Sequence, residues 1–218
     1  MSIRINDIAP DFTVESTAGK LNLHQWIGSG YAILFSHPKD FTPVCTTEFG
    51  AVAQLAPEFA KRNTKVLGVS VDNVEEHKKW KRDIESFAGS PADFPIIDDT
   101  SLHVSKLYDM LPADAYLPDG RTPADSATVR TVFIIGPDKK VRLTMSYPMS
   151  VGRNFAEILR ALDAVQATDG VPIATPANWV PGQDVIVALS LNDAQAKEKF
   201  GEIDVKLPYL RFAKAPKK

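Results

Sequence analysis

The strongest constraint on the fold is an alternation of short apolar runs with amphipathic stretches. Tyr31–Phe35 is a nearly continuous apolar run, which is typical of a strand buried on both faces. Apolar residues then recur at helical spacing through Thr46–Arg62, where Pro57 predicts a kink. A strand at Val66–Val71 and a helix over Asp72–Phe87 repeat the order. Because parallel strands need crossover connections, this order favours an α/β fold with a mixed central sheet flanked by helices.

The remaining pattern completes this layered unit. Asp72 and Glu75 resemble a capping pair at the start of the second helix. An N-terminal hairpin is expected to precede the first strand. The further predicted elements are a strand at Phe94–Ile97, a helix at Leu102–Met110, a hairpin of Thr131–Ile135 and Val141–Ser146 around Gly136-Pro137-Asp138, and a helix at Phe155–Val165.

Proline becomes frequent beyond about Thr168, and this change predicts a domain boundary. We assign residues 1–168 to the main domain and residues 169–218 to a small C-terminal α+β domain. A strand is expected at Val185–Leu189 and a helix at Asn192–Phe200. Because a piece of this size buries little surface, it should pack against the main domain or a second subunit. The chain is therefore expected to form a homodimer.

Composition excludes several classes of function. The 218 residues are 44% hydrophobic and 24% charged, which is close to globular averages. A formal charge of −2 gives no general attraction to nucleic acid or to an anionic membrane. No apolar run approaches the roughly 20 residues that span a bilayer, and the N-terminus lacks a signal-peptide core. These features predict a soluble, cytoplasmic protein with no nucleic-acid or membrane partner.

Cys45 is the only cysteine of the chain, and it lies where a loop leads into a predicted helix. A lone cysteine is usually a small buried hydrophobe, but a helix N-terminus favours the thiolate, which is the reactive form. An imidazole, a rigid ring and a hydroxyl precede it at His37, Pro38 and Thr42. These neighbours indicate a nucleophile. One cysteine cannot form an internal disulfide, so any disulfide chemistry must involve a second molecule.

The segment Pro38-x-x-x-Thr42-x-x-Cys45, together with Arg130 on a later strand, resembles the active-site signature of the peroxiredoxins. The resemblance continues through residues 41–48, 94–99, 136–140 and 147–155, and it includes the C-terminal appendage. The whole chain is similar to the one-cysteine subfamily. The resemblance implies a thioredoxin-like fold with a C-terminal domain, and it makes Cys45 the peroxidatic cysteine.

The chemistry of peroxide reduction agrees with these residue types. As the thiolate attacks one oxygen and the O–O bond breaks, negative charge moves from sulfur to the departing oxygen. Arg130 offers fixed, permanently charged donors at both ends of that reaction, although by sequence alone it could be a surface arginine. Thr42 can donate to a peroxide oxygen, or it could be a turn or cap hydroxyl. Pro38 can exclude water from the sulfur, or it could simply end a strand.

Three further residues have supporting roles in the resemblance. His37 matches a subfamily histidine near the cysteine, where it can bind the thiol or the substrate, although lone histidines are more often structural. Glu48 matches a glutamate that orients the catalytic arginine, with a first-turn helix carboxylate as the competing interpretation. Arg153 matches a second arginine near the pocket. No cofactor is expected, and the four histidines show no zinc-like spacing.

The predicted function is a thiol-specific peroxidase that reduces hydrogen peroxide and small organic hydroperoxides through a sulfenic acid on Cys45. Because there is no second cysteine, an external thiol such as glutathione or thioredoxin must recycle the enzyme. The alternatives are a peroxide-sensing or chaperone-like protein without efficient turnover and, more weakly, a cysteine hydrolase. The resemblance implies a dimer or a larger ring.

Some animal members of the subfamily also have phospholipase activity, assigned to a serine in a Gly-x-Ser-x-Gly stretch. Here the corresponding stretch is Gly28-Ser29-Gly30-Tyr31-Ala32, with Gly30 at the serine position. His24 and Asp138 match the other proposed members of that triad. Without the serine, no lipase activity is predicted.

Overall fold

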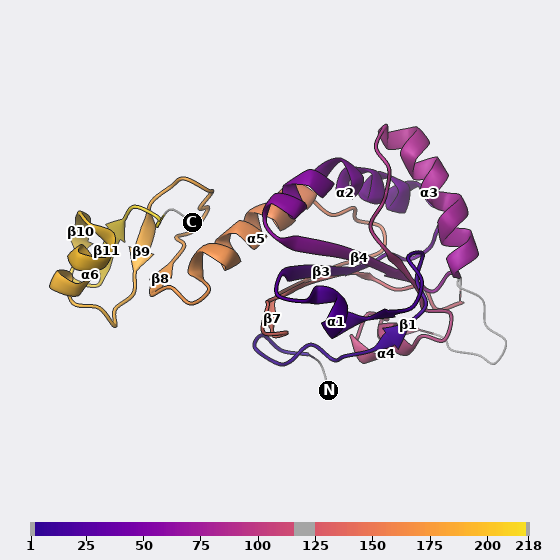
Figure 1. Ribbon diagram of the computed structural model, residues 1–218, viewed down its shortest axis with the longest axis horizontal. Coiled ribbons are helices and arrows are strands. Elements are labelled where there is room, and N and C mark those ends of the chain that lie inside the picture. The colour runs from indigo at the N-terminus through magenta and orange to yellow at the C-terminus, as the bar shows by residue number, and fades with distance from the viewer. Residues whose placement is uncertain (1–2, 116–124, 217–218) are drawn as a thin grey trace. The chain divides into compact units, whose positions relative to one another are not determined.

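The computed structural model describes residues 3–115 and 125–216, which form two compact units, Met1–Phe155 and Ala156–Lys218. The sequence-based boundary at residues 168 and 169 therefore falls later in the chain than the division between the compact units. The predicted thioredoxin-like fold lies in the first unit and the predicted α+β domain in the second (Figure 1). Each unit is described separately.

A five-stranded mixed sheet forms the centre of the first unit. Its order is β5-β4-β3-β6-β7, with β3 parallel to β4, β4 parallel to β5, and the other neighbouring pairs antiparallel. The strands are β3 (Tyr31–Ser36), β4 (Thr64–Ser70), β5 (Ile96–Asp98), β6 (Arg130–Ile135) and β7 (Val141–Tyr147). The predicted mixed sheet is confirmed.

Helices cover both faces of this sheet. α2 lies over one face, with α3 beside it, while α1 and α4 lie on the opposite side (Figure 1). The predicted N-terminal hairpin is present as β1 and β2, which pair antiparallel. The bounds are α1 (Leu23–Ile27), α2 (Pro43–Lys61), α3 (Val74–Ala88), α4 (His103–Leu107), β1 (Thr13–Val14) and β2 (Leu21–Asn22).

Alternate residues of the central strands serve the two faces. Leu34 and Phe133 belong to the apolar cluster that also contains the buried side chains of α1 and α4. Phe35 lies on the other face, and its ring centroid is 4.9 Å from that of Phe49 on α2. Gly68 permits this approach, because a Cβ there would come within 3.0 Å of the Phe49 ring. The strand alternation thus determines which side chains face the helix that carries Cys45.

Two helix starts differ from the sequence-based expectation. α2 begins at Pro43 rather than Thr46, since a proline is well tolerated in the first turn of a helix, where its missing N–H costs nothing. The expected cap at Asp72 was wrong: the N-cap of α3 is Asn73, whose side chain accepts from the Glu76 N–H. Asp72 is instead buried, and its carboxylate accepts from the Asp40 N–H.

α4 is shorter than the predicted helix. It covers His103–Leu107, because Leu102 and Asp109 both adopt left-handed backbone conformations, with φ of 59° and 53°. Tyr108 and Met110 follow the helix and are fully buried. The apolar pattern therefore identified core residues correctly while overestimating the length of the helix.

The second unit contains a four-stranded antiparallel sheet of order β10-β11-β9-β8. The predicted strand and helix are present as β9 and α6, whereas β8, β10 and β11 were not predicted. The bounds are α5 (Phe155–Thr168, which starts at the end of the first unit), β8 (Ile173–Ala174), β9 (Val185–Val187), α6 (Asp193–Phe200), β10 (Ile203–Leu207) and β11 (Leu210–Ala213). Within the described ranges, no helix is long and apolar enough to cross a bilayer.

Candidate active site

Cys45 lies in the first turn of α2, as the third residue of the helix. Thr42 is the N-cap residue and Pro43 follows it, so the backbone N–H groups of Val44 and Cys45 have no intrahelical acceptor. The unpaired N–H groups and the helix dipole favour negative charge at this position. Cys45 is a free cysteine and is fully buried. The structure therefore places the sulfur where a thiolate is stabilised and bulk water is excluded.

Arg130 brings a guanidinium to this sulfur. It is the first residue of β6, and its Nη1 donates to Cys45 Sγ at 3.4 Å and to Glu48 Oε2 at 2.6 Å. Its Nε donates to the carbonyl oxygen of Met149 at 2.8 Å. The arginine is therefore held by acceptors on two sides, the Glu48 carboxylate and the Met149 carbonyl oxygen, with its charge directed at the sulfur.

Glu48 and Arg153 complete a buried charge cluster. Arg153 donates to Glu48 Oε1 from its backbone N at 2.8 Å and from its Nε at 2.9 Å, and Nη2 donates to Oε2 at 2.7 Å. The Arg153 guanidinium carbon also lies 5.1 Å from the centroid of the Phe35 ring. One carboxylate thus connects both arginines, as the resemblance implied for the catalytic one.

The buried charge cluster beside Cys45 is positive on balance. Two guanidiniums and one carboxylate leave one positive charge uncompensated inside the protein, and a thiolate cancels it. Burial opposes ionisation of Glu48, but hydrogen bonds and charge attraction from Arg153 and then Arg130 outweigh it, so the Glu48 pKa lies below its usual range. Glu48 consequently stays anionic while it holds the guanidiniums.

Thr42 and Pro38 flank the cysteine in the preceding loop. The Thr42 hydroxyl donates to the Lys39 carbonyl oxygen at 2.9 Å, and its lone pairs remain available as acceptors. Donation to a peroxide requires this hydroxyl to release Lys39. Pro38 is buried, and its role in keeping water from the sulfur stays a prediction. Phe41 between them has φ of 55°, so the loop turns sharply just before α2.

His37 lies on the same sheet face as Arg130. Phe35 of β3 pairs with Val132 of β6, so these two side chains share a sheet face, and His37 and Arg130 each lie two residues from this pair and so on the same face. The His37 ring lies 4.5 Å from the Phe49 ring, one helical turn beyond Cys45. The structure therefore brings His37 to the helix that carries the cysteine.

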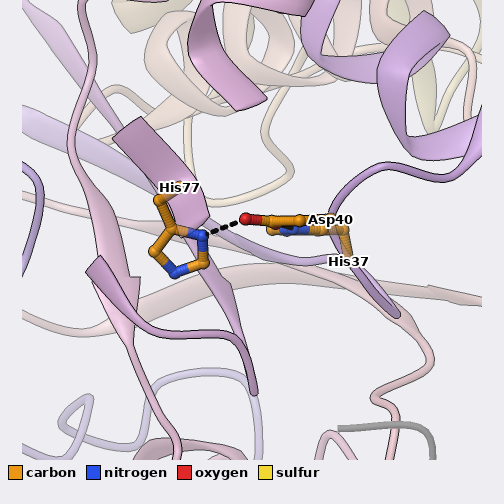
Figure 2. A group of neighbouring side chains, drawn as sticks. All are labelled: His37, Asp40 and His77. Atoms are coloured by element: carbon orange, nitrogen blue, oxygen red, sulfur yellow. Dashed lines mark hydrogen bonds and ion pairs between the residues drawn. The ribbon is translucent and has the colours of Figure 1, made fainter. Parts of the chain in front are cut away.

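His37 also belongs to a cluster that sequence reasoning missed. Asp40 Oδ1 lies 2.7 Å from His37 Nε2, and Asp40 Oδ2 lies 2.6 Å from His77 Nδ1 (Figure 2). All three side chains are fully buried. The spacing of His37 and Asp40 gave a local signal, but His77 comes from α3 and only the fold brings it to the same point.

This cluster has donors suited to a metal ion, two imidazoles and a carboxylate. The distances between these nitrogen and oxygen atoms, however, are those of hydrogen bonds. Ligands at about 2.1 Å from a tetrahedral zinc ion lie roughly 3.4 Å from one another, whereas both nitrogen–oxygen contacts are 2.7 Å or less. The residues as they stand are hydrogen-bonded to each other, and they do not form a cage for a metal.

The two parts of the chain match two family models. Residues 5–144 match the AhpC/TSA family, and residues 164–202 match the C-terminal domain of 1-Cys peroxiredoxin. This chain belongs to the 1-Cys peroxiredoxins. It is therefore a thiol-dependent peroxidase with a thioredoxin-like fold.

Known peroxiredoxins resemble the chain over nearly its whole length. Mitochondrial peroxiredoxin PRX1 of Saccharomyces cerevisiae is 49% identical, over 98% of this chain and 81% of the relative. Peroxiredoxin-6 of Mus musculus is 45% identical, over 97% of each chain. The crystal structure of a cysteine-to-serine mutant of peroxiredoxin 6 from Arenicola marina superposes with a TM-score of 0.92 at 41% identity, covering 100% of both chains.

The lipase-like triad is not assembled in this peroxiredoxin. A Cβ at Gly30 would come within 2.6 Å of the Asn63 carbonyl oxygen, so a side chain there requires the backbone to shift. His24 Nε2 lies 2.7 Å from the Ala9 carbonyl oxygen, and Asp138 forms an ion pair with Arg142. His24 and Asp138 thus each have a structural partner, and neither needs a catalytic serine to explain its position.

Proposed function

We propose that Cys45 is the peroxidatic nucleophile of this peroxiredoxin and that Arg130 stabilises both its thiolate and the departing oxygen. The observation that carries the proposal is the 3.4 Å contact between Arg130 Nη1 and Cys45 Sγ at the start of a helix. In the reaction the sulfur forms a bond to one peroxide oxygen while the O–O bond breaks. The departing oxygen takes a proton and leaves as water or an alcohol, and Cys45 becomes a sulfenic acid.

Glu48, Arg153, Thr42 and Pro38 support this step in the proposal. Glu48 and Arg153 keep the Arg130 guanidinium aimed at the sulfur. Thr42 exchanges its bond to Lys39 for one to the peroxide, and Pro38 keeps water from the sulfur. The buried sulfur favours small substrates, so we propose hydrogen peroxide and small organic hydroperoxides.

Recycling requires a thiol from another molecule, because Cys45 is the only cysteine. The incoming thiol bonds to sulfur as water leaves, and a second thiol then releases Cys45 and carries away the disulfide. One solved structure, of a yeast mitochondrial 1-Cys peroxiredoxin with 48% identity and a TM-score of 0.87 over 97% of this chain and 99% of that one, concerns thiol resolution through the glutathione/thioredoxin systems. We propose a reductant of the same kind here.

Access for that thiol implies local opening. The Cys45 sulfur is fully buried, and a surface hollow of about 480 Å³ borders the first turn of α2, lined by Phe41, Thr42, Pro43, Thr46, Thr47, Trp80, Asp83 and Phe87. Reduction by a bulky thiol therefore needs the first turn to unwind. A peroxide sensor without turnover is the less favoured alternative, since the family consists of thiol peroxidases.

Stopped-flow mixing with hydrogen peroxide tests the role of Arg130. Replacing an oxyanion-stabilising donor typically costs about 100-fold in rate, so Arg130→Gln should slow Cys45 oxidation by about that factor. Arg4→Gln is the matched control, because Arg4 is exposed and pairs only with nearby Asp7. An Arg130→Gln protein that folds normally and reacts at the wild-type rate would contradict the proposal.

We also propose a homodimer or a larger ring, and a cytoplasmic location. β7 is the outermost strand of the described sheet, and beyond Val141, whose backbone is hydrogen-bonded to Asn6 and Asp7, no described strand pairs with its outer edge. Met149 and Val151, just beyond β7, are apolar and 36% and 44% exposed. Sedimentation equilibrium tests the assembly: a monomer at micromolar concentration would contradict it. Cell fractionation tests the location.

A further inference from the structure

The buried cluster of His37, Asp40 and His77 holds its protons in one arrangement. His77 Nε2 lies 2.9 Å from the Ile97 carbonyl oxygen, which can only accept, so this nitrogen carries a proton. His77 Nδ1 and Asp40 Oδ2 are 2.6 Å apart and need a second proton between them. His37 Nε2 and Asp40 Oδ1, at 2.7 Å, need a third. Three contacts thus contain three protons.

The middle proton determines where the charge lies. If this proton is on His77, the pair consists of an imidazolium and an Asp40 carboxylate. If it is on Asp40, both groups are neutral. Burial raises the pKa of Asp40, but hydrogen bonds from His37 and His77 outweigh burial and bring the pKa below its usual range. The Asp40 N–H also donates to the buried Asp72 carboxylate. Asp40 is therefore an anionic acceptor between two buried imidazoles.

His37 is the neutral member of the cluster. Burial lowers the pKa of His37, and this effect outweighs the hydrogen bond and the charge attraction of Asp40. With its proton on Nε2, its Nδ1 keeps a bare lone pair. Nδ1 is one of two buried side-chain nitrogen or oxygen atoms in the described residues that have no hydrogen-bond partner. A buried unpaired acceptor is costly, which indicates a use for it.

The position of His37 indicates that use. Its ring packs on Phe49, one turn beyond Cys45 on α2, on the sheet face from which the Arg130 guanidinium contacts the sulfur. Arg130 supplies only donors, whereas a protonated hydroperoxide also has an O–H group that needs an acceptor. The bare Nδ1 is such an acceptor.

We propose that Asp40 and His77 are positioning residues of the peroxidase site, which lock His37 as the Nε2–H tautomer so that Nδ1 accepts a hydrogen bond from the bound hydroperoxide. The proposal rests on the peroxidase function assigned to Cys45. Asp40 fixes the tautomer by accepting from Nε2, and His77 fixes Asp40 because its ring is bonded both to Asp40 and to the Ile97 carbonyl oxygen on β5. No proton is transferred to His37.

Nitrogen-15 NMR of the imidazole rings in the reduced, full-length protein tests the lock directly. His37 should show one protonated nitrogen, Nε2, and one bare nitrogen, Nδ1. His103, at the surface, supplies a reference ring. A proton on His37 Nδ1, or a bare His37 Nε2, would overturn the proposal. This measurement needs no variant and so does not depend on how a substitution folds.

Peroxide kinetics test the functional part. Asp40→Leu removes the acceptor for Nε2–H and should slow Cys45 oxidation roughly 3- to 10-fold, the value of one hydrogen bond. Asp40→Asn can accept from His37 and donate to His77, and should restore most of that loss. A wild-type rate for a folded Asp40→Leu protein, or no recovery with Asp40→Asn, would overturn the role.

A double-mutant cycle distinguishes positioning from a structural effect. His37→Phe should slow Cys45 oxidation by the same 3- to 10-fold. The double variant with Asp40→Leu should then react at the rate of His37→Phe alone. A further loss in the double variant would show that Asp40 acts without His37. Stoichiometric transition metal in the purified protein would also overturn the proposal, since an ion would replace the shared protons. If the Cys45→Ser control oxidises like wild type, the peroxidase assignment itself fails, whatever His37 does.

Discussion

Glu48 is the residue on which the active-site charges depend most. Both oxygens of its carboxylate are used, and they join two buried guanidiniums of which one contacts the catalytic sulfur. Sequence reasoning identified Glu48 through the family resemblance, because a glutamate three residues after Cys45, near the start of a predicted helix, is otherwise interpreted as an ordinary dipole-compensating residue. It did not identify Asp40 or His77, since no local pattern indicates which distant histidine a buried carboxylate meets.

Neutralising Glu48 should impair both stability and reaction. Glu48→Gln leaves Arg130 and Arg153 without their shared anion, and breaking a buried ion pair typically costs about 3 to 5 kcal/mol of unfolding free energy. Denaturant unfolding measures the stability and stopped-flow mixing the rate of Cys45 oxidation. Glu58→Gln is the control, because Glu58 pairs on the surface with Lys61 and should matter little. Equal effects of the two substitutions would contradict this role.

The same carboxylate predicts a dependence of stability on pH. The Glu48 pKa is lower in the folded protein than its ordinary value of 4.5, so its contribution is complete above that value. This contribution is lost as the pH falls through the lowered pKa of the folded state. The pKa of Asp40 is also lowered, so its contribution to the unfolding free energy is lost in the same direction. Unfolding free energy measured from pH 6 down to pH 2 should fall less steeply for Glu48→Gln than for wild type. Parallel curves would contradict the assignment.

At the scale of single elements, the strand and helix alternation was predictable and the helix ends were less so. The run Tyr31–Phe35 became β3 with one added residue, because a buried strand is specified by continuous apolar character. The start of α2 was misplaced because Pro43 was not considered as its first residue. The prediction that Cys45 lies at or near the first turn of this helix is confirmed, since it is the third residue of α2.

The packing of α2 on the sheet gives a prediction for Gly68. A methyl group there would lie 3.0 Å from the Phe49 ring, and Phe49 is one turn beyond Cys45. Gly68→Ala should therefore lower the free energy of unfolding by about 1 to 3 kcal/mol, as overpacked cores do. At Gly152 the nearest contact would be an ordinary 3.4 Å, so Gly152→Ala should cost less. Thermal unfolding of the two variants tests the difference, and a larger loss for Gly152→Ala would contradict it.

At the scale of the whole molecule, the two-part organisation was predictable because proline frequency and strand patterning change along the chain. The position of the division was harder to predict: α5 runs from Phe155 to Thr168, and an uninterrupted helix gives no compositional signal. β10 was also missed, because its side chains are mostly exposed and show no buried face.

The whole molecule also sets the chemistry of the cycle. A chain with one cysteine must complete its reaction on another molecule. Because Cys45 is buried at the start of α2, we expect small peroxides to reach it in the folded state, whereas reduction by a thiol requires the first turn of the helix to open. A bulky thiol should therefore reduce oxidised Cys45 faster as low denaturant loosens the first turn of α2, whereas peroxide reduction should not accelerate. Stopped-flow rates with glutathione and with hydrogen peroxide below the unfolding transition measure this difference. Acceleration of both, or of neither, would contradict the need for opening.

The central claim is that the single sulfur of Cys45 reduces peroxide, and its most direct test is a titration with one equivalent of hydrogen peroxide, followed by intact mass and a thiol assay. The reduced wild type should consume one peroxide per chain within the stopped-flow time range, lose its thiol and gain one oxygen atom, and an added thiol should reverse the change. Cys45→Ser should consume none. Equal consumption by Cys45→Ser, or a wild-type thiol that survives the titration, would contradict the claim.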